Sequence, residues 1–119
     1  MSDLAIRNQG HAGRITLTRP RALNALTHDM VVAIDAALES WAQDPAVSLV
    51  LVDAEGPRAF CAGGDLARME KAAKMTKARS RREASRFAKL LYRLHAYPKP
   101  VVARVHGPAF AGGMGLVAA

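Results

Sequence analysis

The sequence predicts an α/β fold, and three observations support this. Half of the 119 residues are hydrophobic, which is enough for a core and too many for a disordered chain. Short apolar runs of strand type alternate with longer stretches of helical periodicity. Two glycine-rich loops each follow an expected strand and precede an expected helix. At this length, at most one small domain is expected.

Residues 4–8 and 14–18 are expected to form the two strands of a hairpin, with turn residues at 10–13. In the second strand, Ile15 and Leu17 alternate with threonines, as in a strand with one buried face. Pro20 then ends regular pairing.

A helix is expected from an N-cap at Thr27 to about residue 43. Its apolar residues recur at three- and four-residue spacing and form one stripe: Met30, Val31, Ile34, Leu38 and Trp41. Residues 48–52 form a continuous apolar run, which predicts a strand buried on both faces of a parallel sheet. A right-handed crossover would join it to the preceding strand, and residues 53–58 would be a loop.

A short helix is expected after Asp65, and a longer one over residues 80–96 with Phe87, Leu90, Leu91 and Leu94 on its apolar side. A strand over residues 101–105 follows, and another helix begins near Met114. Because that apolar helix has barely begun at Ala119 and shows no C-cap signal, we expect the sequence to be part of a larger domain.

The net charge of +7 fits either nucleic acid or a polyanionic small molecule as partner. Many of the basic residues fall between residues 68 and 93, where the simplest interpretation is a solvated helix face. No zinc-finger spacing, recognition-helix pattern or aromatic RNA motif accompanies them, so we expect no nucleic-acid partner.

Cys61 is the only cysteine, which rules out an internal disulfide and fits a reducing compartment. The sequence shows no signal peptide and no apolar run of membrane-spanning length. We therefore expect a cytoplasmic protein that does not associate with membranes. The histidines show no ligand spacing, so no metal site is expected.

Two segments carry the chemistry, Cys61-Ala62-Gly63-Gly64-Asp65 and Ala111-Gly112-Gly113-Met114-Gly115. Each is a loop of small residues between an expected strand and an expected helix. Backbone N–H groups at a helix start are unpaired, and two that converge on one point would stabilise a negative oxygen. Either segment alone is also typical of a plain turn. Neither is a phosphate-binding P-loop or a dinucleotide-binding fingerprint.

Three segments, in this order, resemble the enoyl-CoA hydratase/isomerase (crotonase) family: residues 15–26, residues 58–66, and residues 98–103 with 107–115. The resemblance covers nearly the whole chain. It implies an α/β fold of the crotonase-like type, a spiral of ββα units, here cut short. Residues 1–119 would be the N-terminal part of one acyl-CoA-binding domain.

The resemblance also implies roles for particular residues. The backbone N–H groups of Gly64 and Gly112 would bind the thioester oxygen as it gains enolate character. Arg21 matches a loop that packs on coenzyme A, and is either a phosphate contact or a solvated arginine. The other positions implied to contact the substrate are Ala22 and Leu23 in that loop, and Ala62, Asp65 and Leu66 along the adenine and pantetheine path.

The sequence departs from the hydratases of the family at Gly115, where they usually carry a glutamate. Their second glutamate would lie beyond Ala119. Hydration needs carboxylates to activate water and to protonate carbon. Asp65 is better interpreted as a helix N-cap or a loop anchor than as a base, and no other carboxylate is well placed. His106 and Cys61 are interpreted as structural rather than catalytic residues.

The leading expectation is a lyase of fatty acid metabolism that hydrates a 2-enoyl-CoA. Coenzyme A would be part of the substrate, with no separate cofactor. The alternatives are a 3-hydroxyisobutyryl-CoA-type thioester hydrolase, an inactive truncated fragment that binds CoA esters, and a nucleic-acid binder. Since the family forms trimers and hexamers, a complete domain is expected to be a homo-oligomer.

Overall fold

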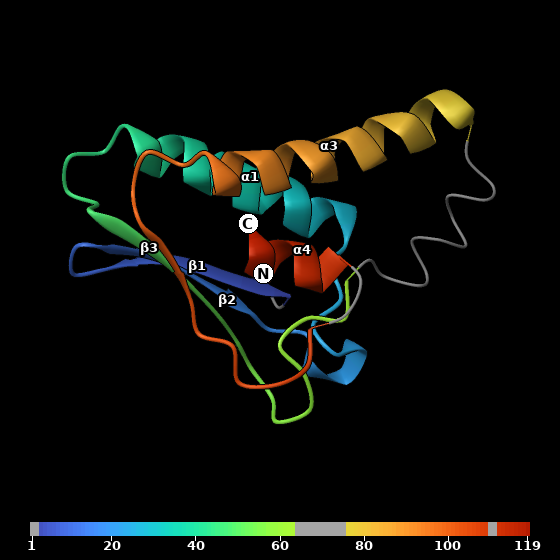
Figure 1. Ribbon diagram of the computed structural model, residues 1–119, viewed down its shortest axis with the longest axis horizontal. Coiled ribbons are helices and arrows are strands. Elements are labelled where there is room, and N and C mark those ends of the chain that lie inside the picture. Colours follow the sequence, from blue (N-terminus) through green and yellow to red (C-terminus); the bar gives the residue numbers. More distant parts are fainter. Residues whose placement is uncertain (1–2, 64–75, 110–111) are drawn as a thin grey trace.

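The computed structural model describes residues 3–63, 76–109 and 112–119. Helices α1 and α3 lie together on one side of the strands (Figure 1). The elements, in chain order, are β1 (Leu4–Gln9), β2 (Ala12–Leu17), the short 3-10 helix η1 (Pro20–Ala22), α1 (His28–Ala42), β3 (Leu49–Ala54), α3 (Lys77–His95), β4 (Val101–Ala103) and α4 (Gly112–Ala118).

Strands β1 and β2 form the expected antiparallel hairpin, in a register that runs from Leu4 opposite Leu17 to Gln9 opposite Ala12. The turn is tighter than expected, because only Gly10 and His11 lie between the strands. Gly10 has a φ of 60°, the left-handed conformation that a two-residue hairpin turn requires.

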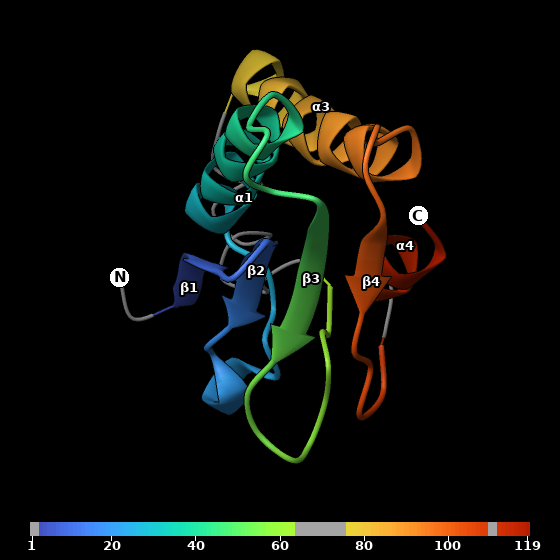
Figure 2. The same ribbon diagram turned by 90° about the vertical axis from the view of Figure 1, so that its left-hand side faces the viewer.

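The described strands form one mixed sheet in the order β1-β2-β3-β4 (Figure 2), and β3 pairs parallel with both β2 and β4. The parallel pairing was predicted. The prediction that β3 is buried on both faces was wrong, because Leu49, Leu51 and Val52 are only partly buried. Strand β3 also continues through Asp53 and Ala54, which were expected in a loop.

Helix α1 confirms the sequence-based prediction. Thr27 caps it, with its Oγ1 accepting a hydrogen bond from the Met30 N–H at 3.2 Å. The buried residues of the helix are the five of the predicted stripe. Trp41 lies flat on β2 at Gly13, where an added Cβ would stand 2.5 Å from the indole ring. The indole Nε1 donates to Asn8 Oδ1 on β1 at 3.0 Å.

Helix α3 begins at Lys77, three residues earlier than expected, because the Thr76 side chain caps it. Leu90 and Leu94 are buried, and the Arg93 Nε atom pairs with Asp35 Oδ1 of α1 at 2.6 Å. Strand β4 is two residues shorter than expected, and α4 begins two residues before Met114. The short helix expected after Asp65 lies outside the described residues.

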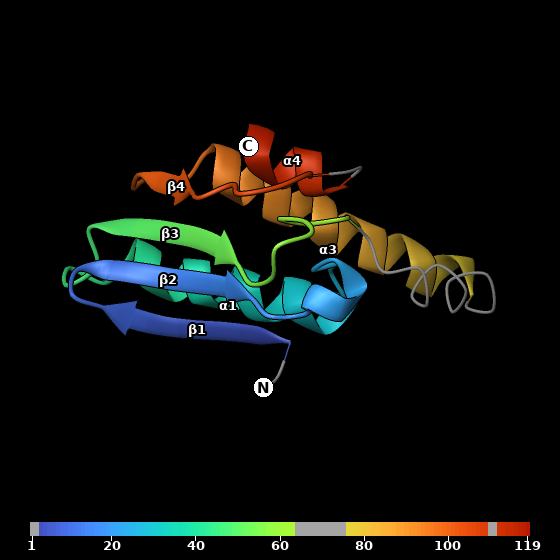
Figure 3. The same ribbon diagram turned by 90° about the horizontal axis from the view of Figure 1, so that it is seen from below.

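Both long helices cover the same face of the sheet (Figure 3). The core between these layers consists of apolar side chains from β2, α1, β3, α3 and the segment after β3, among them Ile15, Leu17, Met30, Leu38, Val50, Phe60 and Leu90. Among the described residues, no helix is both long and apolar enough to cross a bilayer.

Candidate functional site

The two glycine-rich segments lie against each other in the structure. Cys61 and Ala109 form a parallel β-bridge outside the main sheet. The Phe60 N–H donates to the Pro108 carbonyl oxygen at 2.9 Å. The loop after β3 and the loop after β4 are therefore joined by backbone hydrogen bonding, as expected for loops that follow neighbouring parallel strands.

Gly113 is the point of closest approach between these segments. A Cβ added to it would lie 2.3 Å from the backbone oxygen of Cys61, so no side chain fits there without displacing backbone. Gly112 is the first residue of α4, and its N–H therefore has no acceptor within that helix. The first turn of α4 therefore lies beside Cys61 of the first glycine segment. The described part of that segment ends two residues further on, at Gly63.

The loop predicted to pack on coenzyme A is bonded to the first glycine segment. The Ala62 N–H donates to the Leu23 carbonyl oxygen at 3.0 Å, and the Leu26 N–H donates to the Gly63 carbonyl oxygen at 2.7 Å. The structure therefore brings together Leu23 and Ala62, which were predicted to line the same ligand. Arg21 is exposed and Ala22 is partly buried.

Three of the predicted site residues, Gly64, Asp65 and Leu66, lie outside the described residues. Gly64 directly follows Gly63, whose φ of 92° is in the left-handed region. The roles proposed for these three residues stay predictions from the family resemblance.

Sequence reasoning missed Asn24, which is fully buried at the centre of this arrangement. Its side-chain oxygen accepts a hydrogen bond from the Arg19 N–H at 2.9 Å. Its side-chain nitrogen donates to the carbonyl oxygens of Glu55 at 2.8 Å and Ala59 at 3.2 Å. The signal available in the sequence was a single amide within the apolar run Leu23-Asn24-Ala25-Leu26.

Cys61 and His106 have the structural surroundings that the sequence suggested. Burial raises the pKa of the Cys61 thiol above its ordinary value of 9.0, although the Gly63 N–H donates to its sulfur at 3.4 Å. A thiol with a raised pKa is a poor nucleophile at neutral pH. The His106 Nε2 atom lies 2.5 Å from the Gly56 carbonyl oxygen, so this nitrogen carries a proton and links two loops.

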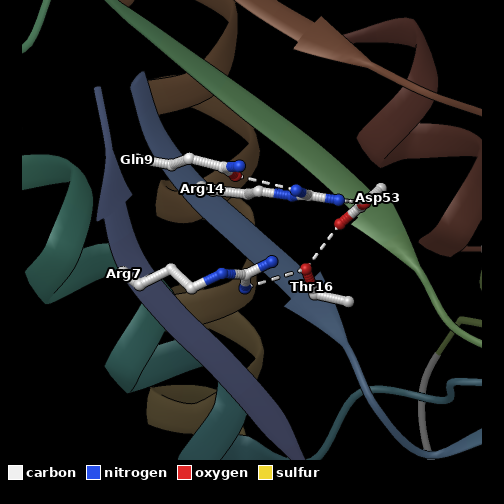
Figure 4. A network of polar contacts seen from close by, with 5 residues as sticks. All are labelled: Arg7, Gln9, Arg14, Thr16 and Asp53. Carbon is white, nitrogen blue, oxygen red and sulfur yellow. Dashed lines mark hydrogen bonds and ion pairs between the residues drawn. The ribbon is translucent and has the colours of Figure 1, made fainter. Parts of the chain in front are cut away.

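Asp53 is a buried carboxylate on the sheet face that points away from α1 and α3 (Figure 4). Its oxygens accept hydrogen bonds from Arg14 Nη2 at 2.5 Å and from the Thr16 hydroxyl at 2.6 Å. Arg7 Nη1 also donates to the Thr16 hydroxyl, at 3.2 Å.

Burial alone would raise the pKa of Asp53. The hydrogen bonds from Arg14 and Thr16 and the nearby arginine charges outweigh burial and lower this pKa below the ordinary 3.8. Because its proton affinity is lowered and both oxygens are occupied, Asp53 is unsuited to act as a general base.

The family resemblance implies that hydratases usually carry a glutamate at the position of Gly115. A Cβ at this position would lie 3.2 Å from Leu91 Cδ1, so the glycine lets α4 approach α3 closely. Glu55 is exposed. Within residues 3–63, 76–109 and 112–119, no group of three or more histidine, cysteine or acidic residues is placed to hold a metal ion.

The basic residues of α3 mostly face solvent, as the simplest interpretation of the charge run predicted. Arg93 is the member that forms an ion pair, with Asp35. The exposed members are Lys77, Arg79, Arg81, Arg82, Arg86 and Lys89.

Comparison with known proteins supports the arrangement of these segments. The enoyl-CoA hydratase/isomerase family model matches residues 12–119. An enoyl-CoA hydratase of Rhodobacter sphaeroides superposes with a TM-score of 0.91 at 49% identity, over 97% of this chain and 34% of that one. A carnitinyl-CoA dehydratase of Mycobacterium thermoresistibile superposes with a TM-score of 0.89 at 36% identity, over 95% and 33% of the two chains.

Curated relatives include the mitochondrial 3-hydroxyisobutyryl-CoA hydrolase of Xenopus tropicalis, 41% identical over 96% of this chain. The chain spans about 30% of the length of that hydrolase and about a third of the two solved structures. The match extends through β2, the loop of Asn24 and both glycine segments, and the fold is that of the crotonase-type enzymes. This chain therefore belongs to the enoyl-CoA hydratase/isomerase family.

Proposed function

We propose that the protein binds an acyl-CoA thioester and stabilises its enolate oxygen with the backbone N–H groups of Gly64 and Gly112. The contact between the two glycine segments is the observation that carries this proposal. The Cys61–Ala109 bridge and the approach of Gly113 to the Cys61 oxygen hold α4 beside the first segment. Fixed N–H dipoles at such a junction would stabilise charge that develops on a carbonyl oxygen.

The reaction that we propose first is the addition of water to a 2-enoyl-CoA. The water oxygen bonds to the β-carbon and gives up a proton to a base, while the C=C π electrons move so that the thioester oxygen takes up enolate charge. An acid then protonates the α-carbon, and the thioester carbonyl re-forms. The glycine N–H groups would stabilise the enolate, whereas the water and proton steps need acid–base groups. In the family those groups are carboxylates, and Gly115 replaces one of them in this chain.

The first experiment uses a 3-oxoacyl-CoA, whose enolate forms readily and absorbs in the near ultraviolet. We expect the protein to bind this thioester more tightly than free coenzyme A and to raise the enolate absorbance. Gly112→Pro removes one N–H at the first position of α4, where proline is tolerated. Gly112→Ala keeps the N–H and is the matched control.

We expect Gly112→Pro to abolish the enolate absorbance, and to lower turnover about 10²–10³-fold if the protein is active. The control is expected to keep the absorbance. Equal binding of the thioester and free coenzyme A by the unmodified protein would contradict the proposed function. So would an enolate signal that survives Gly112→Pro.

The second candidate is hydrolysis of a β-hydroxyacyl-CoA thioester. Two observations favour it, namely Gly115 in place of a glutamate and the similarity to mitochondrial 3-hydroxyisobutyryl-CoA hydrolases. Release of free coenzyme A thiol from 3-hydroxyisobutyryl-CoA would support it. Loss of the conjugated enoyl absorbance from a 2-enoyl-CoA would support hydration instead, and binding without either reaction would indicate a CoA-ester-binding protein.

A further inference from the structure

We propose that Asn24 is a positioning residue that holds the first glycine segment in the geometry needed to stabilise the enolate. This inference rests on the proposed function and deepens it. The bonds that its side chain makes among the described residues are to backbone groups of Arg19, Glu55 and Ala59, so it would act through the backbone that it braces.

The Asn24 amide joins three parts of the chain. Its oxygen accepts from the Arg19 N–H, and both protons of its nitrogen are used, one on the Glu55 oxygen and one on the Ala59 oxygen. These acceptors lie 31 and 35 residues away in sequence. Because Asn24 is fully buried, water cannot replace any of these bonds. The loop before α1 is thereby fixed to the segment that leads into Cys61.

The backbone conformation of Leu23 and Asn24 is the second observation. Leu23 and Asn24 have φ angles of 54° and 56°, so two successive non-glycine residues are left-handed. Such residues are strained and persist only where the surroundings enforce them. Asparagine tolerates this conformation better than most residues, because its short amide can bond locally.

This turn places one acceptor and one donor opposite the glycine segment. The Leu23 oxygen accepts from the Ala62 N–H, and the Leu26 N–H donates to the Gly63 oxygen. Gly63 immediately precedes Gly64, whose N–H is proposed to bind the thioester oxygen. A change in the Asn24 amide would therefore reach the oxyanion site through Ala59, Ala62 and Gly63.

Two substitutions separate the amide from the backbone conformation. Asn24→Gly removes the amide but still permits a positive φ. Asn24→Asp keeps the size and the acceptor for Arg19, but turns a carboxylate toward two carbonyl oxygens. Asn8→Ala is the matched control, because Asn8 also bonds through its side chain, to Trp41 Nε1, on a strand away from the glycine segments.

The assays use the protein as it exists, well below its unfolding temperature. We expect Asn24→Gly and Asn24→Asp to lower the enolate absorbance of bound 3-oxoacyl-CoA and to reduce kcat about 10–100-fold, with a smaller change in KM, since small misplacements of reacting groups cost rates of this order. The Asn8→Ala control is expected to lower Tm while leaving kcat and the enolate absorbance unchanged.

Asn24→Asp should also differ from the unmodified protein in its response to pH. A protonated carboxyl can donate to one carbonyl oxygen, so the enolate signal of Asn24→Asp, divided by that of the unmodified protein at the same pH, should rise as the pH falls. A folded Asn24→Gly protein with unchanged kcat and enolate absorbance would overturn the positioning role.

Hydrogen exchange separates failure of this inference from failure of the proposed function. We expect the Ala62 and Leu26 amides to exchange at least about tenfold faster in Asn24→Gly, because their acceptors are no longer held. If the unmodified protein does not bind the thioester, the proposed function fails. If these two amides exchange at the unmodified rate in Asn24→Gly, the positioning inference fails whether or not the thioester binds.

Discussion

The buried face of helix α1 and the junction of the two glycine segments are held in different ways. Helix α1 packs on the sheet through large side chains such as Leu38, which is fully buried. At the junction, backbone meets backbone, as where Gly113 approaches the Cys61 oxygen and Phe60 bonds to Pro108. Side-chain packing can adjust to a change of shape, whereas a backbone contact leaves no room for an added atom. We therefore expect α1 to lose stability when side-chain volume is removed, and the junction to lose stability when volume is added.

The largest effect is expected from removing volume under α1. Leu38→Ala should lower the free energy of unfolding by about 2–5 kcal/mol, because it leaves a cavity in the core. Leu38→Met conserves the volume and should cost less than about 1.5 kcal/mol. Urea unfolding followed by circular dichroism measures both. Similar losses for the two variants would show that α1 does not rely on adjustable side-chain packing.

Adding a single methyl group tests the junction. Gly113→Ala should gain about 1 kcal/mol of helix propensity and lose about 1–3 kcal/mol through the clash with the Cys61 oxygen, a net loss of up to about 2 kcal/mol. Gly115→Ala is the control, since its methyl would meet only the flexible end of Leu91. We expect the control to be neutral or stabilising in thermal unfolding. If Gly113→Ala raises Tm as much as Gly115→Ala does, Gly113 does not lie as close to the Cys61 oxygen as described.

The polar face of the sheet provides a third test, through pH. The pKa of Asp53 is lowered in the folded state, so its ionised form stabilises the fold above the ordinary, unfolded pKa of 3.8. This contribution is lost as the pH falls through the folded value. Asp53→Asn should be less stable by about 1–3 kcal/mol at neutral pH, since Arg14 loses its charged partner.

The measurement is a series of unfolding curves between neutral pH and about pH 2, with Asp29→Asn as the exposed control. The stability difference between Asp53→Asn and the unmodified protein should shrink as the pH falls below about 4. A difference that stays constant over this range would contradict an ionised Asp53.

The smallest effect is expected at the far end of α1. Lys99 Nζ donates to the carbonyl oxygens of Trp41 at 2.5 Å and Asp44 at 2.7 Å, so its charge lies at the C-terminus of the helix. Lys99→Met should cost about 0.3–1 kcal/mol, as expected for a cation at this helix end. Lys89→Met, on the exposed side of α3, should change the unfolding free energy by less. If Lys99→Met lowers the unfolding free energy no more than Lys89→Met does, Lys99 does not cap α1.

Local patterns predicted α1 and the hairpin well because their signals are contained in neighbouring residues. The stripe from Met30 to Trp41 repeats within one helix, and Thr27 stands directly before it. The start of α3 was missed because its first residues are charged rather than apolar, and only the Thr76 cap marks it. Asp53 was expected in a loop because its partner Arg14 lies 39 residues away.

The candidate site was predictable in part for the same reason. The glycine segments could be recognised from residue type and order, and their mutual contact follows from parallel pairing of β3 and β4. The bracing by Asn24 could not be predicted, because the carbonyl oxygens that its amide contacts lie on a distant segment. The residues that carry these oxygens have no distinctive sequence signal. A carbonyl oxygen is present at every residue, so sequence alone cannot say which one an amide will meet.

The reactivity of the Cys61 thiol reports how often the folded protein opens locally. The sulfur is fully enclosed beneath the junction, and its raised pKa makes it still less reactive while the fold is closed. An alkylating reagent can therefore modify it only during moments when the surrounding segments separate. The labelling rate therefore measures the frequency of local opening. A bound acyl-CoA that holds the junction closed should lower this rate.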